Sequence, residues 1–107
     1  MVVNQYSIYL INLDPTQGSE MQKTRPCVVL TPNEMNKHIN TVQIAPLTST
    51  LRSYPWRAEV TLKGKAGKIA LDHIRAIDKS RIIKKQGELN DTEIRQVKNI
   101  IKEMLID

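Results

Sequence analysis

One arginine stands where a polar segment meets an apolar one, and its surroundings suit it to binding an oxyanion. Residues 23–26 read Lys-Thr-Arg-Pro and lead directly into an apolar run. Pro26 biases the preceding residue towards an extended conformation, so Arg25 projects from the point where loop becomes strand. Its planar guanidinium offers a fork of donors that matches phosphate oxygens. A surface ion pair with Glu20 or Asp72 is the alternative that the local sequence leaves open.

Motifs for metals, cofactors and nucleophiles are absent from the sequence, and Asp72 and Asp78 could join a metal site only with partners that it does not identify. The chain has two His and one Cys, with no CxxC or HxxxH pair, so it lacks the spacing of a zinc site. Residues 64–66 read Gly-Lys-Ala, without the hydroxyl residue that ends a phosphate-binding P-loop, and no GxSxG is present. We therefore expect any reaction to proceed without a metal or bound cofactor.

Length and charge bound the class of protein. The 107 residues fit a single domain over 1–107, and 40% of them are hydrophobic, enough for a folded core. Sixteen Lys and Arg against eleven Asp and Glu give a net charge of +5, which favours an anionic partner such as RNA, although a well-solvated surface explains charge equally well. The sequence has no membrane-length apolar run and no secretory leader, and its Cys27 is alone, so we expect a cytoplasmic protein.

Short β-type runs separated by Pro- and Gly-bearing turns predict the elements that position these residues. Strands are predicted at 6–13, 26–30, 41–47, 56–62, 68–71 and 74–77, with a turn at 64–67 and helical turns at 33–40 and 79–85. Asn90 and Glu93 form a capping box that begins a C-terminal amphipathic helix. The apolar face of that helix comprises Ile94, Val97, Ile101, Met104 and Leu105. The fold class is mainly β with α: a small, strongly bent β-barrel with a C-terminal helix packed on it.

Two aromatic residues near the fourth predicted strand differ in their phase. Trp56 alternates with Ala58 and Val60, which predicts that Trp56 lies in the core. Tyr54 precedes the strand in a polar loop, which makes it the better candidate for stacking on a nucleic-acid base.

Three separated motifs resemble the MazF/PemK toxins of bacterial toxin–antitoxin systems. The first comprises residues 12–20 (NLDPTQGSE) and 24–30 (TRPCVVL). The second comprises 46–49 (PLTS) and 54–56 (YPW), and the third is 72–78 (DHIRAID). The resemblance covers nearly the whole chain, with the motifs in order. It implies an SH3-like barrel with a C-terminal helix, a homodimer, and sequence-selective cleavage of single-stranded RNA. It also implies an antitoxin partner whose peptide occupies the RNA groove.

The resemblance also implies roles for particular residues. Arg25 and Thr48 match the catalytic Arg and Thr of the family, and Asp72 matches an Asp to which some PemK-type enzymes assign the base. Those enzymes carry a catalytic Arg where this chain has Ala70, which shifts weight to Arg25. The base itself stays open between Asp72, His73 and solvent. The candidate RNA-binding residues are Ser19, Glu20, Lys23, Thr24, Ser49, Arg52, Tyr54 and His73.

Two other functions remain as alternatives. A CcdB-like toxin shares the fold and poisons DNA gyrase without cutting RNA, but the Arg-Pro and Pro-Leu-Thr motifs argue against it. A catalytically silent SH3-like module would bind RNA or an acidic peptide only. Without the resemblance, the Thr48 hydroxyl would be interpreted as a cap for the loop backbone.

Overall fold

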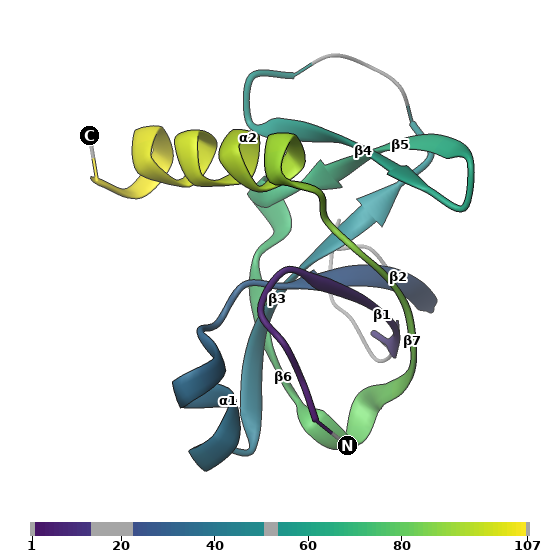
Figure 1. The fold of residues 1–107 in the computed structure, drawn as a ribbon, viewed down its shortest axis with the longest axis vertical. Coiled ribbons are helices and arrows are strands. Elements are labelled where there is room, and N and C mark those ends of the chain that lie inside the picture. The colour runs from purple at the N-terminus through teal and green to yellow at the C-terminus, as the bar shows by residue number, and fades with distance from the viewer. Residues whose placement is uncertain (1, 14–22, 51–53, 107) are drawn as a thin grey trace.

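A computed structural model describes residues 2–13, 23–50 and 54–106 of the chain. These residues form a strongly curved antiparallel sheet with a helix at each end (Figure 1). The strands are β1 Ser7–Asn12, β2 Thr24–Val29, β3 Thr41–Thr48, β4 Arg57–Leu62, β5 Lys65–Ala70, β6 Arg75–Asp78 and β7 Ile82–Glu88. The helices are α1 Asn33–His38 and α2 Asp91–Ile101, which continues as a π-helix, η3 Lys102–Ile106. Short 3₁₀ turns occupy η1 Leu71–His73 and η2 Lys79–Arg81. The predicted bent β-architecture with a C-terminal helix is confirmed.

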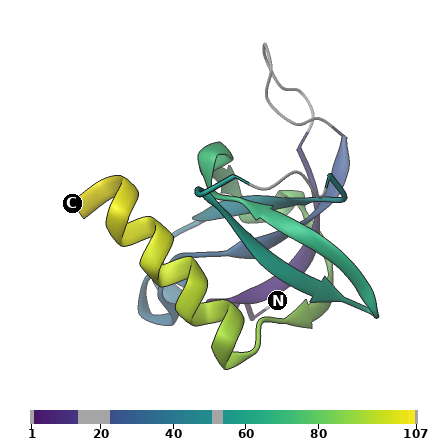
Figure 2. The ribbon, with the colours of Figure 1, turned by 90° about the horizontal axis from the view of Figure 1, so that it is seen from above.

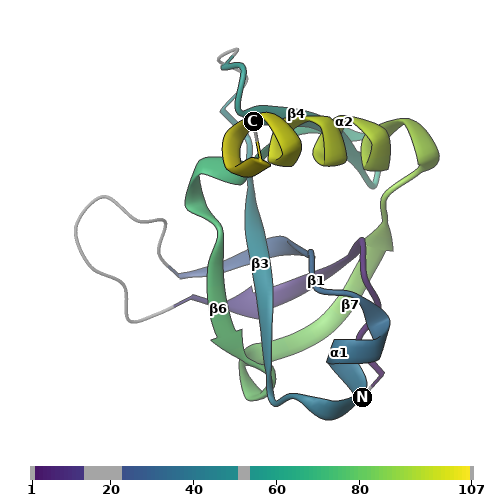
Figure 3. The same cartoon turned by 90° about the vertical axis from the view of Figure 1, so that its left-hand side faces the viewer.

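Strand β3 is the central element, because it changes partner along its length. The main order of strands is β4-β5-β3-β2-β1-β7, and β6 pairs with β3 beside this path. The first part of β3 pairs with β6 and β2, whereas Leu47 and Thr48 pair with Ile69 and Lys68 of β5. Figure 3 shows β3 running between α1 at one end of the molecule and α2 at the other.

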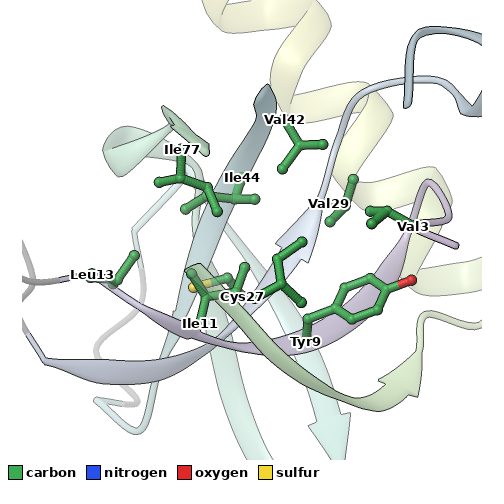
Figure 4. Packing of buried hydrophobic residues seen from close by; sticks show 10 residues of the cluster. Val3, Tyr9, Ile11, Leu13, Cys27, Val29, Val42, Ile44 and Ile77 are labelled. Carbon is green, nitrogen blue, oxygen red and sulfur yellow. The ribbon is translucent and has the colours of Figure 1, made fainter. Parts of the chain in front are cut away.

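Alternation along the strands supplies two hydrophobic clusters, one for each side of the curved sheet. In β2, Cys27 and Val29 belong to the first cluster, which also contains Ile11 and Ile44 (Figure 4). The intervening Val28 belongs to the second cluster, against which α2 packs. Because both faces of β2 are buried, its register is strongly fixed, and Arg25 is held at the end of a rigid strand.

Helix α2 begins with the predicted capping box. The Asn90 side chain accepts a hydrogen bond from Glu93 N–H at 2.8 Å, and Glu93 Oε1 accepts one from Asn90 N–H at 2.9 Å. The helix lies along one side of the strands (Figure 2), with Val97 fully buried. At the far end of the predicted apolar face, Met104 and Leu105 are exposed. No described helix is long and apolar enough to cross a membrane.

Several sequence predictions about individual elements are wrong. Residues 79–85 hold only one short helical turn and then begin β7, a strand that pairs with β1 through two register shifts. The β4–β5 turn is shorter than predicted: it comprises Lys63 and Gly64, whose φ angles are 52° and 79°, and residues 65–67 already belong to β5. Two successive positive φ angles are the geometry of a two-residue hairpin turn, which is compatible with Gly at the second position.

Trp56 is not in the core. Arg57 N–H donates to the Tyr54 carbonyl at 3.1 Å, which closes a turn over residues 55 and 56 before β4 begins. The alternation of β4 therefore does not extend back to Trp56, whose exposed fraction is 39%.

Candidate functional site

The end of the β2–β3 ladder opens a cavity of about 390 Å³. The pairing of these strands ends at Cys27 opposite Pro46, and the next two residues of β3, Leu47 and Thr48, pair with β5. Continued by two residues, the same register would bring Arg25 level with Thr48. The lining residues of the cavity are Lys23, Thr24, Arg25, Pro26, Leu47, Thr48, Ser49, Val60, Leu62, Lys65, Ala66 and Gly67. Three of these described residues are cations and none is acidic, so the cavity favours an anion.

Arg25 lies at this cavity without a charged partner among the described residues. The Arg25 side chain is partly buried. Its Nε atom is fully buried and has no hydrogen-bond partner in the part of the chain that the structure describes. A buried donor without an acceptor costs on the order of 1–3 kcal/mol, and an anionic ligand would recover that cost. The predicted alternative of an ion pair with Asp72 is not formed, because Asp72 pairs with Arg57. Glu20, the other alternative partner, lies outside the described residues.

Thr48 is held in place by two contacts of its own. Its hydroxyl oxygen accepts a hydrogen bond from Thr50 N–H at 3.2 Å, so the loop-capping interpretation is correct as a description of the contact. A hydroxyl that accepts one bond can still donate its proton, so this cap orients Thr48 without using its donor. Behind the strand, a Cβ added to Gly67 would lie 3.0 Å from the Thr48 carbonyl oxygen. The absence of a side chain at Gly67 therefore permits the close approach of β5 to Thr48.

A second arginine lies near the first. Burial raises the pKa of the Cys27 thiol to about 12. The positive charges of Arg25 and Arg75 both lie close enough to lower this pKa, but their effect is smaller than that of burial. Arg75 Nη1 donates to the Leu13 carbonyl at 3.4 Å, and Leu13 N–H donates to the Lys23 carbonyl at 2.9 Å. These bonds tie β6 to the ends of β1 and β2 beside the cavity. With so high a pKa, the thiol is protonated at neutral pH and is a poor nucleophile.

Asp72 and His73 belong to a different cluster, beside the start of β4. Arg57 Nε and Nη2 donate to the two Asp72 carboxylate oxygens at 3.2 Å each, and His73 Nε2 lies 3.5 Å from Asp72 Oδ2. Tyr54 stacks on Trp56 with ring centroids 5.0 Å apart and an interplanar angle of 15°. The Arg57 guanidinium lies over the Tyr54 ring at 5.0 Å.

The structure thus divides the sequence-predicted site residues into two groups. Arg25 and Thr48 line one cavity, joined by Lys23, Thr24 and Ser49. Asp72, His73 and Tyr54 lie in the ion-pair and aromatic cluster instead, and none of them lines that cavity. Ser19, Glu20 and Arg52 lie outside the described residues.

Sequence reasoning missed four residues that the structure places at these sites. Lys65 and Gly67 line the cavity, and Arg57 and Trp56 complete the aromatic cluster. A glycine inside a strand often marks a close backbone approach, and that signal could have identified Gly67. No pattern in the sequence pairs Arg57 with Asp72, because they are brought together only by the β4–β5 pairing.

A larger cavity, of about 450 Å³, lies between β4 and α2. Several of its polar groups are already engaged, since Glu59 N–H donates to Gln96 Oε1 at 3.1 Å and Thr61 N–H to Glu93 Oε2 at 2.8 Å. These bonds cover the edge of β4, and such covering prevents pairing with another strand. Within the described ranges, no group of three or more His, Cys, Asp and Glu could hold a metal ion.

Comparisons with known proteins assign the chain to a family. The sequence profile of the PemK-like, MazF-like toxins of type II toxin–antitoxin systems matches residues 4–105. An endoribonuclease MazF of Staphylococcus saprophyticus is 33% identical over 100 residues, which cover 88% of this chain and 83% of that protein. The crystal structure of MazF from Deinococcus radiodurans superposes with a TM-score of 0.87 at 26% identity, over 98% of this chain and 97% of that one.

A MazE–MazF structure from Deinococcus radiodurans has a TM-score of 0.80 at 23% identity, over 99% of this chain and 97% of that chain, and supports the fold alone. The profile spans nearly the whole chain, and the sequence relative exceeds 30% identity over most of its length. The chain therefore belongs to the PemK-like, MazF-like family of toxins from type II toxin–antitoxin systems.

Proposed function

We propose that this toxin is an endoribonuclease that cuts single-stranded RNA at selected sequences without a metal, by attack of a substrate 2′-hydroxyl on the adjacent phosphate. The observation that carries the proposal is Arg25, whose buried Nε lacks a partner among the described residues and whose cavity is lined by cations. The curated relative named an endoribonuclease supports the reaction class.

The proposed reaction needs stabilisation of the pentavalent phosphate, a base for the 2′-hydroxyl and a proton for the departing 5′-oxygen. Arg25 stabilises the pentavalent phosphate by binding a non-bridging oxygen and by donating a hydrogen bond to the departing 5′-oxygen, which takes its proton from water. With a pKa above about 12, a guanidinium is a poor base near neutral pH. The Thr48 hydroxyl donates a hydrogen bond to the same phosphate, while the bond from Thr50 N–H fixes the orientation of the Thr48 side chain.

The reaction also needs a group that removes the proton of the 2′-hydroxyl. Asp72 is the candidate from the family resemblance, but in this structure its two oxygens are occupied by Arg57. These two hydrogen bonds fix the carboxylate against the Arg57 guanidinium. We therefore assign Asp72 to positioning Arg57. Because His73 contacts Asp72 and does not line the cavity, we assign proton removal to solvent.

The same cavity is proposed as the site of inhibition by a cognate antitoxin. The structures of MazE–MazF complexes are those of relatives, and they motivate the proposal that an antitoxin peptide competes with RNA for the cationic cavity. A homodimer acting in the cytoplasm completes the proposal.

The test is cleavage of a long RNA by purified protein in excess EDTA, with the cut ends mapped. We expect defined cuts from the wild type, a loss of at least about 100-fold for Arg25→Ala, and partial retention for Arg25→Lys, which keeps charge but not the planar fork. Arg95→Ala is the matched control, because it removes an exposed arginine on α2.

Intact RNA with folded wild-type protein would contradict the proposal. Inhibition of DNA gyrase would instead indicate the CcdB-like alternative, and RNA that is bound but uncut would indicate a binding module. Cleavage by Arg25→Ala at the rate of Arg95→Ala would remove Arg25 from the mechanism.

A further inference from the structure

Trp56 is the only tryptophan of the chain, and it is exposed at a fixed place on the surface. It lies in the turn before β4, with 39% of its surface accessible, and it stacks nearly parallel on Tyr54. An exposed tryptophan with one ring neighbour leaves flat aromatic surface available to solvent. The stability of the core does not require this arrangement, because the core clusters of the described residues do not include Trp56.

The stack is held rigidly from behind. Arg57 lies 5.0 Å from the centre of the Tyr54 ring and is fixed by two hydrogen bonds of 3.2 Å to Asp72. Arg57 N–H also closes the turn onto the Tyr54 carbonyl. A ring fixed in this way loses little further conformational entropy when it binds a ligand, so its contact contributes efficiently to affinity.

The position of the stack relates it to the cationic cavity. Thr48 pairs with Lys68, and Arg57 pairs with Ala70 two residues further along β5. Strands β3 and β4 lie on either side of β5, so Thr48 and Arg57 are separated by two interstrand spacings and by two residues along the strand direction. Together these separations place the two Cα atoms about 12 Å apart. An RNA strand with one phosphate at the cavity can therefore extend along β5 towards Trp56.

We propose that Trp56 is a stacking surface for an unpaired base of the RNA substrate, with Tyr54 and Arg57 as positioning residues. This inference rests on the proposed function and adds a substrate contact to it. The alternation of the sequence predicts Trp56 in the core and Tyr54 as the residue that stacks on a base, and the inference reverses these two roles. The Tyr54 ring contacts Trp56 and Arg57, whereas the Trp56 ring is exposed. Every base has a π-face, so the contact contributes affinity at a fixed register rather than a hydrogen-bond code.

The test uses the intrinsic fluorescence of Trp56, which in a single-tryptophan chain reports on this position alone. The ligand is a fluorescein-labelled RNA in which every 2′-hydroxyl is methylated, so that it cannot be cut by the proposed route. An unlabelled copy of this RNA should quench the tryptophan emission of the protein in a saturable way. The quenching should occur at the same concentrations at which the fluorescence anisotropy of the labelled RNA reports binding. Loss of the stacked ring in Trp56→Leu should weaken binding about 5- to 150-fold, and Trp56→Phe should restore much of it.

Ile83→Ala is the control, since it removes an exposed apolar side chain from β7, and thermal unfolding verifies that each variant is folded. Binding without quenching, or equal affinity for Trp56→Leu and wild type, would overturn the inference while leaving Arg25-dependent cleavage intact. Conversely, Trp56-dependent binding by a protein that cuts no RNA would overturn the proposed function alone. No binding of the methylated RNA by folded protein, or quenching only by an acidic peptide, would also overturn the inference.

Discussion

Replacing Gly67 with alanine should slow RNA cleavage while leaving the protein folded, because the added methyl group presses on the backbone of Thr48. The new Cβ would lie 3.0 Å from the Thr48 carbonyl oxygen, whereas ordinary van der Waals contact begins at 3.4 Å. Relief of this contact requires a displacement of about 0.4 Å. If a 1 Å misplacement costs about 100-fold in rate, a logarithmic interpolation gives a loss of about sixfold.

The effect on stability is expected to be small by comparison. Alanine gains about 0.5–1 kcal/mol over glycine inside a strand, while overpacking costs about 1–3 kcal/mol, so the net loss is about 0–2.5 kcal/mol. The assay is the single-turnover rate constant for cleavage at saturating protein, measured beside urea-induced unfolding at the same temperature.

Gly87→Ala provides the matched control. A Cβ there would lie 3.1 Å from Leu62 Cδ1, the end of a flexible side chain that can rotate away, so we expect stability and rate close to those of the wild type. The reasoning is refuted if Gly67→Ala cuts RNA at the wild-type single-turnover rate. It is also refuted if both glycine variants slow cleavage equally.

Four other outcomes test the site and the fold. Thr48→Val should slow cleavage about 10- to 100-fold, measured at saturating RNA, because it keeps the shape and removes the donor, whereas Thr48→Ser should retain most activity. Asp72→Asn should weaken RNA binding through Arg57 more than it lowers the cleavage rate; a rate loss above about 100-fold, with an altered pH profile, would instead identify Asp72 as the base. Asn90→Ala should cost about 1 kcal/mol in urea unfolding, since it removes the cap of α2. Between pH 9 and 12 the free energy of unfolding should fall, because the folded thiol of Cys27 stays protonated to about pH 12 whereas the unfolded one ionises near 9.0, and Cys27→Ala should abolish that contribution.

Local sequence signals predicted the elements whose side chains alternate cleanly or whose ends are capped. Residues of β2 and β3 alternate between two buried clusters, so their hydrophobic pattern specifies the strands directly. The capping box of α2 is formed as predicted, because it involves only residues three apart. Strand β7 was missed because its exposed lysines and its two register shifts against β1 obscure any alternation.

Long-range contacts explain which features of the candidate site the sequence could not predict. Local sequence pointed to Arg25 and the family resemblance added Thr48, and in the structure both line one cavity. By contrast, the pairing of Asp72 with Arg57 depends on a contact fifteen residues apart in sequence that no local pattern encodes. Trp56 was misplaced because one backbone hydrogen bond closes a turn and ends the strand after it.

The central claim is that the substrate's own 2′-hydroxyl attacks a phosphate held by Arg25 and Thr48. The most direct measurement uses a short RNA containing a mapped cleavage site, and a second copy with one 2′-deoxy nucleotide immediately 5′ of the cut phosphate. The account predicts that the all-RNA substrate is cut in excess EDTA to a 2′,3′-cyclic phosphate and a 5′-hydroxyl, and that the single deoxy substitution abolishes cleavage there without preventing binding. Cleavage of the deoxy substrate at the same phosphate, or products with a 5′-phosphate, would contradict it.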